Sequence, residues 1–280
     1  MKKILVPCDF SDCSIEAFKF AVDLVAQSQG EVFVLKVIDL PVVYESTFGM
    51  PPYVLNQGFM KELDDDAKTN FIKMIEKYGK KFPFAEFTVI HGPTTPIIRE
   101  FIEDKKIDLV VMGTHGATGM KEFFVGSNTE KIVRFSKVPV FSIKKAVPMT
   151  SIKNIVFPTL LELDQSDLVG KIKVLQNFFK AKLHILVVNT PSNFRTHEEQ
   201  KLAMEEYVRH YGFENYTSNI RNDTYFESDS ILRFTTEVQA DMIAMGTHAR
   251  KGIAHFLNGS TAEDVVNHVN CPIWTSPIRR

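Results

Sequence analysis

The chain has 280 residues, of which 44% are hydrophobic and 24% are charged. This length and composition are typical of a globular protein with two domains of ordinary size. The 33 basic residues nearly balance the 34 acidic ones, and the net charge of −1 excludes a strong general attraction to nucleic acid or to anionic membranes.

Strand and helix signals alternate along the first half of the chain. Short apolar runs predict strands at residues 3–7, 31–38, 85–90, 108–112 and 138–143. Apolar residues at helical spacing predict helices at 14–28, 59–80, around 97–102 and at 127–136, and Gly30 is expected to end the first of these. Buried strands that alternate with helices form parallel sheets covered on both faces. We therefore predict an α/β fold with a doubly wound, Rossmann-like, five-stranded sheet.

The segment from Leu40 to Gly58 fits none of these elements. It is rich in Pro and aromatic residues and is unusually long for a loop between a strand and a helix. Two interpretations stay open: a surface excursion that packs its aromatic residues on its own domain, or a flap over a site or partner.

The second half of the chain repeats the first. Residues 3–7 resemble 154–158 at an offset of 151, and residues 108–115 resemble 241–248 at an offset of 133. The second copy is therefore 18 residues shorter between these two blocks. We predict two tandem domains of the same fold, residues 1–146 and residues 151–280.

A glycine-rich motif follows the fourth predicted strand. It reads G-x2-G-x9-G-S-N and consists of Gly113, Gly116, Gly126, Ser127 and Asn128. Glycines allow backbone amides to approach an anion closely and adopt positive φ where a turn needs it. The last three residues open a helix, whose first amides are unpaired and whose dipole favours negative charge. The pattern indicates a phosphate site, and the absence of a P-loop and of G-x-G-x-x-G excludes the usual NTPase and dehydrogenase motifs.

On this motif and on the opening Val6-Pro7-Cys8-Asp9-Phe10-Ser11, the chain resembles the universal stress protein family, over essentially its whole length and in two copies. The resemblance implies an adenine nucleotide α-hydrolase-like fold and a bound adenine nucleotide, ATP or else ADP or AMP. It also implies the binding residues of the first domain, which are Pro7, Cys8, Asp9, Val37, Met112, Gly113, Gly116, Gly126, Ser127 and Asn128. Asp9 would bind the adenine or ribose end, and Gly126, Ser127 and Asn128 would hold the phosphates.

The second copy keeps only part of this pattern. Asp9 aligns with Leu160 and Gly116 aligns with Ala249, although Gly246, Gly259, Ser260 and Thr261 remain. A Cβ at position 249 intrudes where backbone must approach a phosphate. We therefore predict a degenerate motif in the second domain, and we expect one nucleotide site per chain.

Simpler interpretations of these residues stay open. Asp9, Ser127 and Asn128 are residue types that commonly cap helices. His115 and His248 recur at equivalent positions, but neither stands at ligand spacing from a second His, Cys or carboxylate, so we predict no metal site made by the protein.

The cysteine pattern favours a reducing compartment. The three cysteines are odd in number and form no C-x-x-C pair, which argues against a disulfide framework. The first apolar run, Ile4–Val6, is far shorter than the roughly 7–15 apolar residues of a signal peptide, and no run approaches the roughly 20 of a membrane span. We expect a cytoplasmic protein.

These features together predict a stress-response protein that binds ATP and acts as a sensor or regulator. No catalytic residue is evident, so ATP hydrolysis is expected to be slow or absent. Mg²⁺ or Mn²⁺ is expected to accompany a triphosphate. The alternatives are an adaptor protein whose domains form an internal pseudo-dimer through strands 138–143 and 271–275, open to further homo-oligomerisation, or a binder of a hydrophobic ligand in the second domain.

Overall fold

A computed structural model describes residues 2–39, 57–78, 85–114, 126–191, 194–222, 227–247 and 271–278. Most of the expected loop at 40–58 lies outside the described residues. The same holds for His115, Gly116, His248, Ala249, Gly259, Ser260 and Thr261, and for the side chain of Ser127.

The first half alternates strands and helices as predicted. Its elements are β1 (Lys3–Pro7), α1 (Asp12–Ser28), β2 (Glu31–Ile38), α2 (Gln57–Tyr78), β3 (Ala85–His91), α3 (Thr94–Asp104), β4 (Leu109–Gly113), α4 (Ser127–Phe135) and β5 (Val140–Ile143). A linker with one 3-10 turn, η1 (Met149–Ser151), leads to the second half.

The second half repeats this order. Its described elements are β6 (Asn154–Pro158), α5 (Ser166–Phe179), β7 (Lys182–Asn189), α6 (His197–Tyr211), β8 (Tyr216–Asn222), α7 (Glu227–Glu237), β9 (Met242–Thr247) and β10 (Ile273–Pro277).

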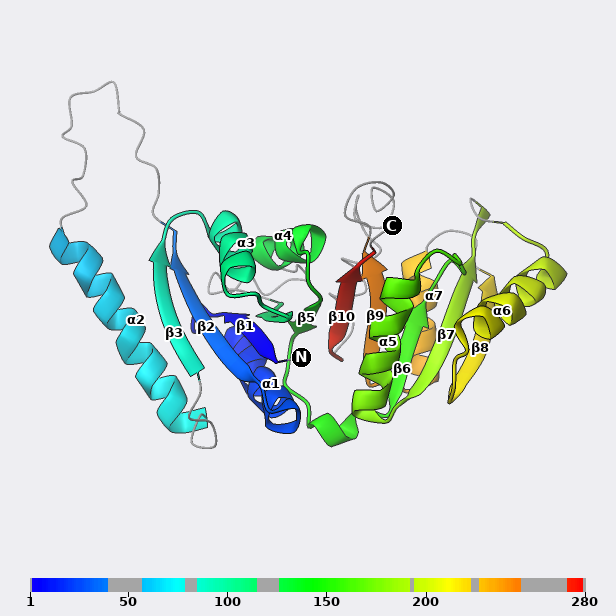
Figure 1. The fold of residues 1–280 in the computed structure, drawn as a ribbon, viewed down its shortest axis with the longest axis horizontal. Helices are drawn as coiled ribbons and strands as arrows, with labels where there is room; N and C mark the ends of the chain where they lie inside the picture. Colours follow the sequence, from blue (N-terminus) through cyan, green and yellow to red (C-terminus); the bar gives the residue numbers. More distant parts are fainter. Residues whose placement is uncertain are drawn as a thin grey trace, which may run out of the picture.

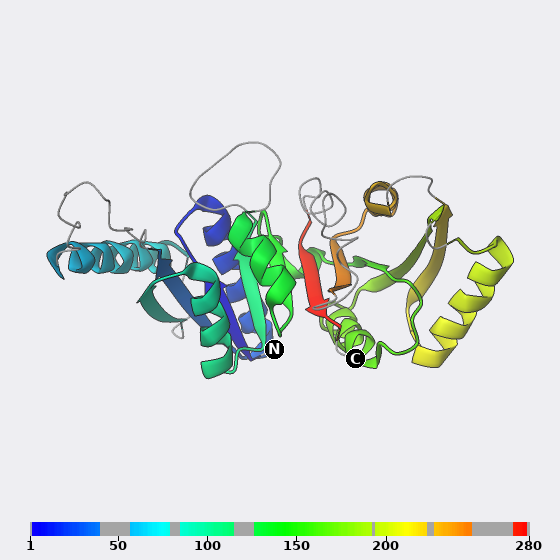
Figure 2. The ribbon, with the colours of Figure 1, turned by 90° about the horizontal axis from the view of Figure 1, so that it is seen from above.

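The ten strands form one sheet in the order β3-β2-β1-β4-β5-β10-β9-β6-β7-β8. Within each half all pairs are parallel and the doubly wound order is the same. At the centre β5 and β10 pair antiparallel, with Phe141 opposite Trp274. The predicted fold class is confirmed, and the two edge strands expected to meet do pair. Both views place this junction in the middle and α2 and α6 at the far ends (Figures 1 and 2).

Unusual backbone conformations recur at the offset of 151 and confirm the repeat in three dimensions. Phe10 and Leu161 both have positive φ (66° and 61°) in the turn after the first strand of each half. Gln29 and Lys180 (52° and 50°) both end the first helix in the left-handed conformation. The predicted end of the first helix at residue 28 is confirmed, but the left-handed residue that ends it is Gln29 and not Gly30. Gly30 is needed instead because a Cβ there would lie 2.5 Å from the carbonyl oxygen of Lys2.

Equivalent aspartates make the same contact with the start of the first strand in each half. Asp108 Oδ2 accepts from the backbone N–H groups of Lys2 and Lys3, at 2.8 and 3.0 Å. Asp241 Oδ2 accepts from those of Lys153 and Asn154, at 2.8 and 2.9 Å. Each carboxylate thus fixes the entry of the chain into the central strand of its half.

The largest apolar core is shared by the two halves. One cluster of buried side chains contains residues of α1 and α5, and it crosses the junction through Phe141 and Trp274. Two smaller clusters belong to single halves: one includes residues of α3 and α4, and the other includes residues of α7. Burial of this shared core stabilises both halves together.

Candidate functional site

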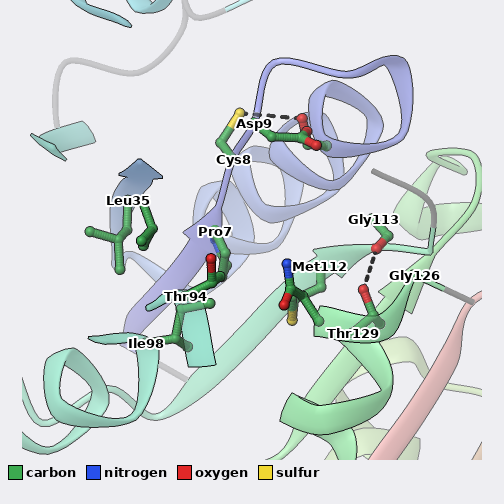
Figure 3. A pocket seen from close by; sticks show the side chains of 13 residues that line it. Pro7, Cys8, Asp9, Leu35, Thr94, Ile98, Met112, Gly113, Gly126 and Thr129 are labelled. Carbon is green, nitrogen blue, oxygen red and sulfur yellow. Dashed lines mark hydrogen bonds between the residues drawn. The ribbon is translucent and has the colours of Figure 1, made fainter. Parts of the chain in front are cut away.

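The carboxyl ends of β1 and β4 border a cavity of about 180 Å³ in the first half. The strand order reverses between these two strands, which is where doubly wound folds bind ligands. Residues from five segments converge on the cavity (Figure 3). Its lining consists of Pro7, Cys8, Asp9, Ser14, Leu35, Val37, Thr94, Ile98, Met112, Gly113, Gly126, Asn128 and Thr129.

Eight of the ten predicted binding residues line this cavity: Pro7, Cys8, Asp9, Val37, Met112, Gly113, Gly126 and Asn128. Of the other two, Gly116 lies outside the described residues, and nothing is described of the Ser127 side chain. The structure therefore brings together segments that are more than 100 residues apart in the sequence.

Five further lining residues escaped the sequence analysis. Leu35 is two residues before Val37, so strand alternation places both on one face of β2. Thr94 and Ile98 lie one helical turn apart at the start of α3. Ser14 and Thr129 lie in the first turns of α1 and α4. Because α3 follows β3 directly, its first turn lies at the carboxyl edge of the sheet, and this position could have indicated Thr94 and Ile98.

The turn after β1 is held by a local hydrogen-bond network. Asp9 Oδ1 accepts from the Ser11 N–H at 3.0 Å and from the Ser11 hydroxyl at 2.6 Å. Ser11 is itself the N-cap of α1, and its hydroxyl accepts from the Ser14 N–H. Asp9 therefore supports the capping residue rather than capping the helix, and it also reaches the cavity.

Cys8 is a buried thiol in the wall of the cavity. Its Sγ lies 3.4 Å from the Ser14 hydroxyl, and its backbone N–H donates to the Leu35 carbonyl at 2.9 Å. Burial raises the pKa of the Cys8 thiol above its ordinary value, since the thiolate is poorly solvated there. This environment makes Cys8 a wall residue rather than a reactive nucleophile.

The base of the motif loop is closed by two hydrogen bonds. The Gly126 N–H donates to the Thr114 carbonyl at 2.6 Å, and the Thr129 hydroxyl donates to the Gly113 carbonyl at 2.8 Å. Gly126 is the N-cap of α4 and contributes no side-chain cap. Ser127 and Asn128 are inside the helix, so the alternative that either is the N-cap was wrong. The N-cap residue therefore leaves the first amides of α4 without a side-chain acceptor of its own, at the edge of the cavity.

Gly113 does not need a positive φ, but it has a packing role that the sequence did not predict. Among the described glycines only Gly92 and Gly212 have positive φ. A Cβ on Gly113 would lie 2.6 Å from the Cys13 carbonyl carbon and 2.8 Å from the Ser14 nitrogen. Gly113 is therefore required for close packing of β4 against the first turn of α1.

The described lining offers little positive charge. It contains no Lys, Arg or His, and Asp9 is its single ionisable acid. Nor do the described residues contain a cluster of three His, Cys, Asp or Glu residues that could hold a metal. Among the described lining residues, an anion would therefore find backbone amides rather than cationic side chains.

The equivalent position in the second half carries different chemistry. Glu227 occupies the place of Thr94 at the offset of 133, as the first residue of α7. Burial raises the pKa of Glu227 to about 7. A carboxylate replaces a hydroxyl where the first half has its cavity, in addition to the exchange of Asp9 for Leu160. Sequence reasoning missed Glu227. The offset of 133, continued back from β9 into α7, is the signal that identifies it.

The fold is that of a tandem α/β protein with a cavity at the carboxyl ends of β1 and β4 in its first half. The family model of the universal stress protein family matches residues 1–144 and 152–277. The chain belongs to the universal stress protein family.

Individual relatives agree with this assignment. A universal stress protein of Methanocaldococcus jannaschii is 35% identical over 148 residues, which are 51% of this chain and 82% of the relative. One of Bacillus subtilis is 31% identical over 146 residues, 51% of this chain and 98% of the relative. The crystal structure of a universal stress protein from Archaeoglobus fulgidus shares the fold of both halves, with a TM-score of 0.75 at 22% identity, covering 99% of this chain and 96% of that chain.

Among the helices in the described part of the chain, none has the length and apolar character that a membrane crossing requires.

Proposed function

We propose that this protein is a cytoplasmic stress-response protein that binds ATP, or ADP or AMP, in its first domain and acts as a nucleotide-dependent sensor or regulator. The observation that carries the proposal is the single cavity that gathers eight predicted binding residues at the β1/β4 switch point. Family membership supports the stress-response role. The three cysteines are all free, which supports a reducing compartment.

The two ends of the cavity suit the two ends of a nucleotide. Leu35, Val37 and Ile98 offer apolar walls to a flat base, and Asp9 offers a polar contact to the base or ribose. The uncapped start of α4 at Gly126 suits the phosphates. Because the described lining has no basic residue, a triphosphate would bring Mg²⁺ or Mn²⁺, held mainly by its own oxygens.

We further propose that the first domain, residues 1–146, binds the nucleotide and that the second domain, residues 151–280, does not. Leu160 removes the polar handle, and Glu227 puts a carboxyl group at the position of Thr94, which lines the cavity in the first half. An anionic ligand would therefore lack the polar contact of Asp9 in the second half and would meet repulsion wherever Glu227 is ionised.

Titration calorimetry of the full chain with ATP and Mg²⁺ tests this proposal. We expect one site per chain, and binding at two equal sites or at none would refute it. Gly116→Ala should lower the affinity for ATP by about ten- to a hundredfold, which is the value of a lost backbone contact to a charged group. It should lower the affinity for adenosine much less.

A second variant probes the other end of the ligand. Asp9→Asn keeps an acceptor for Ser11 and therefore spares the start of α1. It should weaken ATP and adenosine to a similar degree. If both variants changed the ratio of the two affinities equally, the assignment of the ligand's ends would be wrong.

A further inference from the structure

The start of α1 lies between the cavity and the linker that joins the two halves. Asp9 and Ser14 both line the cavity, and Ser11 connects them. Asp9 Oδ1 accepts from the N–H and the hydroxyl of Ser11, and the Ser14 hydroxyl donates to the Ser11 carbonyl at 2.9 Å. We call residues 11–14 the bridging turn. Its position is therefore fixed by groups in the wall of the cavity.

The backbone of the bridging turn packs directly against the end of β4. A Cβ on Gly113 would lie 2.6 Å from the Cys13 carbonyl carbon and 2.8 Å from the Ser14 nitrogen. The next residue, Thr114, donates its N–H to the Ile143 carbonyl at 3.1 Å. The end of β5, where the linker begins, is thus held by the same strand end that the bridging turn contacts.

The first residues of the linker bind to the start of α1. Cys13 Sγ lies 3.9 Å from the Lys144 carbonyl oxygen. The Ala146 N–H donates to Glu16 Oε2 at 2.8 Å, and Glu16 Oε1 pairs with Lys19 at 2.5 Å. The Glu16 carboxylate is therefore held on both sides, and the linker amide is attached to the helix that carries the bridging turn.

The far end of the linker is attached to the second half. Met149 and Ile152 are buried in the shared core. The amides of Lys153 and Asn154 donate to Asp241, the residue before β9. Figure 1 shows the linker running from β5 past α1 to η1. The linker therefore connects the turn beside the cavity with the entry to the second half.

The second half lacks an equivalent bridging turn. Its first helix begins at Ser166, which the offset of 151 aligns with position 15, whereas α1 begins at Asp12. Helix α1 thus starts about one helical turn earlier than α5. A Cβ on Gly246 would meet side-chain atoms of Leu168 and Ile278 rather than helix backbone. The close backbone contact between strand end and helix start belongs to the half that has the cavity.

We propose that the bridging turn couples occupancy of the cavity to the linker, so that the second half senses a bound nucleotide. This inference rests on the proposed nucleotide site. A nucleotide that contacts Asp9 and the bridging turn lowers their mobility, and the Ala146 amide, bonded to the same helix, then opens less often. Coupling between two sites is reciprocal, so loss of the linker contact also lowers the affinity for the nucleotide. Glu16 is a positioning residue in this scheme, since it does not line the cavity.

Hydrogen exchange of the Ala146 amide is the direct test. It is measured by NMR on the full chain with and without saturating ATP and Mg²⁺. We expect ATP to slow this exchange at least about fivefold, the lower limit of typical allosteric coupling. The amides of β8, at the outer edge of the second half, are the control and should exchange at the same rate. Unchanged exchange at Ala146 while ATP binds would overturn the coupling and leave the proposed function standing, whereas absence of ATP binding would overturn both.

Variants of Glu16 test the reverse direction. Glu16→Ala removes the acceptor of the Ala146 amide and should lower the affinity for ATP at least about fivefold. Glu16→Gln keeps an acceptor and should retain most of the affinity. Asp167→Ala is the matched control, because Asp167 is the equivalent residue on α5 and pairs with Lys171 at the surface.

Circular dichroism checks that each variant is folded. If Glu16→Ala is not folded, the exchange experiment on the native chain decides the question. Wild-type affinity in folded Glu16→Ala, or an equal loss of affinity in Asp167→Ala, would overturn the proposal.

Discussion

Replacing two equivalent glycines by alanine should distinguish a glycine that packs against backbone from one that packs against side chains. Gly113 is the last residue of β4, and Gly246, at the offset of 133, is the second-last residue of β9. A Cβ at Gly113 would lie 2.6–2.8 Å from backbone atoms of Cys13 and Ser14. A Cβ at Gly246 would lie 2.7–2.9 Å from side-chain ends of Leu168 and Ile278. Side-chain ends can rotate away, whereas the first turn of α1 must move as a unit.

The magnitudes follow from this difference. Overpacking costs typically 1–3 kcal/mol, and an obstacle made of helix backbone belongs at the upper end. Neither glycine has a positive φ, so alanine also restricts the unfolded chain and returns about 0.4–1 kcal/mol in each variant. We expect Gly113→Ala to lower the free energy of unfolding by about 2 kcal/mol and Gly246→Ala by less than about 1 kcal/mol.

Urea unfolding followed by the fluorescence of Trp274, the chain's single tryptophan, measures both variants. Trp274 lies in the shared core, so its signal reports on loss of that core. Gly113→Ala should also weaken ATP, because the strand end that it displaces borders the cavity. An equal loss of stability in the two variants, or a larger loss for Gly246→Ala, would refute the assignment of Gly113 to backbone packing.

Three further predictions concern pH, turnover and thiol chemistry. Burial raises the pKa of Glu227 from its ordinary 4.5 to about 7, so the folded state keeps a proton that the unfolded state loses, and the free energy of unfolding should fall as pH rises from 4.5 to 7. This pKa shift corresponds to at most about 3 kcal/mol of stability, and because the helix N-terminus favours the carboxylate we expect a loss of about 1–2 kcal/mol. Urea titrations at pH 5 and pH 8 should show a loss of this size in the wild type that is missing in Glu227→Gln. The same pH dependence in both proteins would contradict the prediction. Purified protein should hydrolyse ATP far below the roughly 1–100 per second of kinases, and a phosphate-release assay giving a rate in that range would overturn the sensor proposal. Cys8 should react with iodoacetamide at pH 8 more slowly than free cysteine, as judged by mass spectrometry of the labelled peptide, and labelling as fast as free cysteine would contradict its raised pKa.

The fold was predictable because its signals are local and repeated. Apolar runs such as that in β2 and helical spacing such as that in α1 placed the elements within a few residues. Boundaries were less accurate because they depend on single contacts: Ser11 starts α1 earlier than expected, and left-handed Gln29 ends it before Gly30. The pairing of β5 with β10 could be predicted because a repeated open sheet exposes the same edge twice.

The site was predictable where the glycine-rich motif and the family resemblance mark it. The resemblance to the universal stress protein family implied eight of the lining residues, whereas Ser14 and Leu35 required knowledge of which side chains face the cavity. The purpose of Gly113 could not be predicted, because its close neighbour is the backbone of a helix 100 residues away in sequence. Glu227 shows that a repeat also carries information where its copies disagree.

The antiparallel pairing of β5 with β10 has a consequence for work on the separate domains. In the intact sheet the two outer strands are β3 and β8, and the strands at the junction have no free edge on that side. Cutting the chain at the linker would expose a full-length edge on each fragment, together with the apolar side chains of Phe141 and Trp274. Such edges recruit other strands. Isolated halves should therefore pair with themselves or with each other, and the intact chain is the smallest unit whose binding behaviour represents the protein.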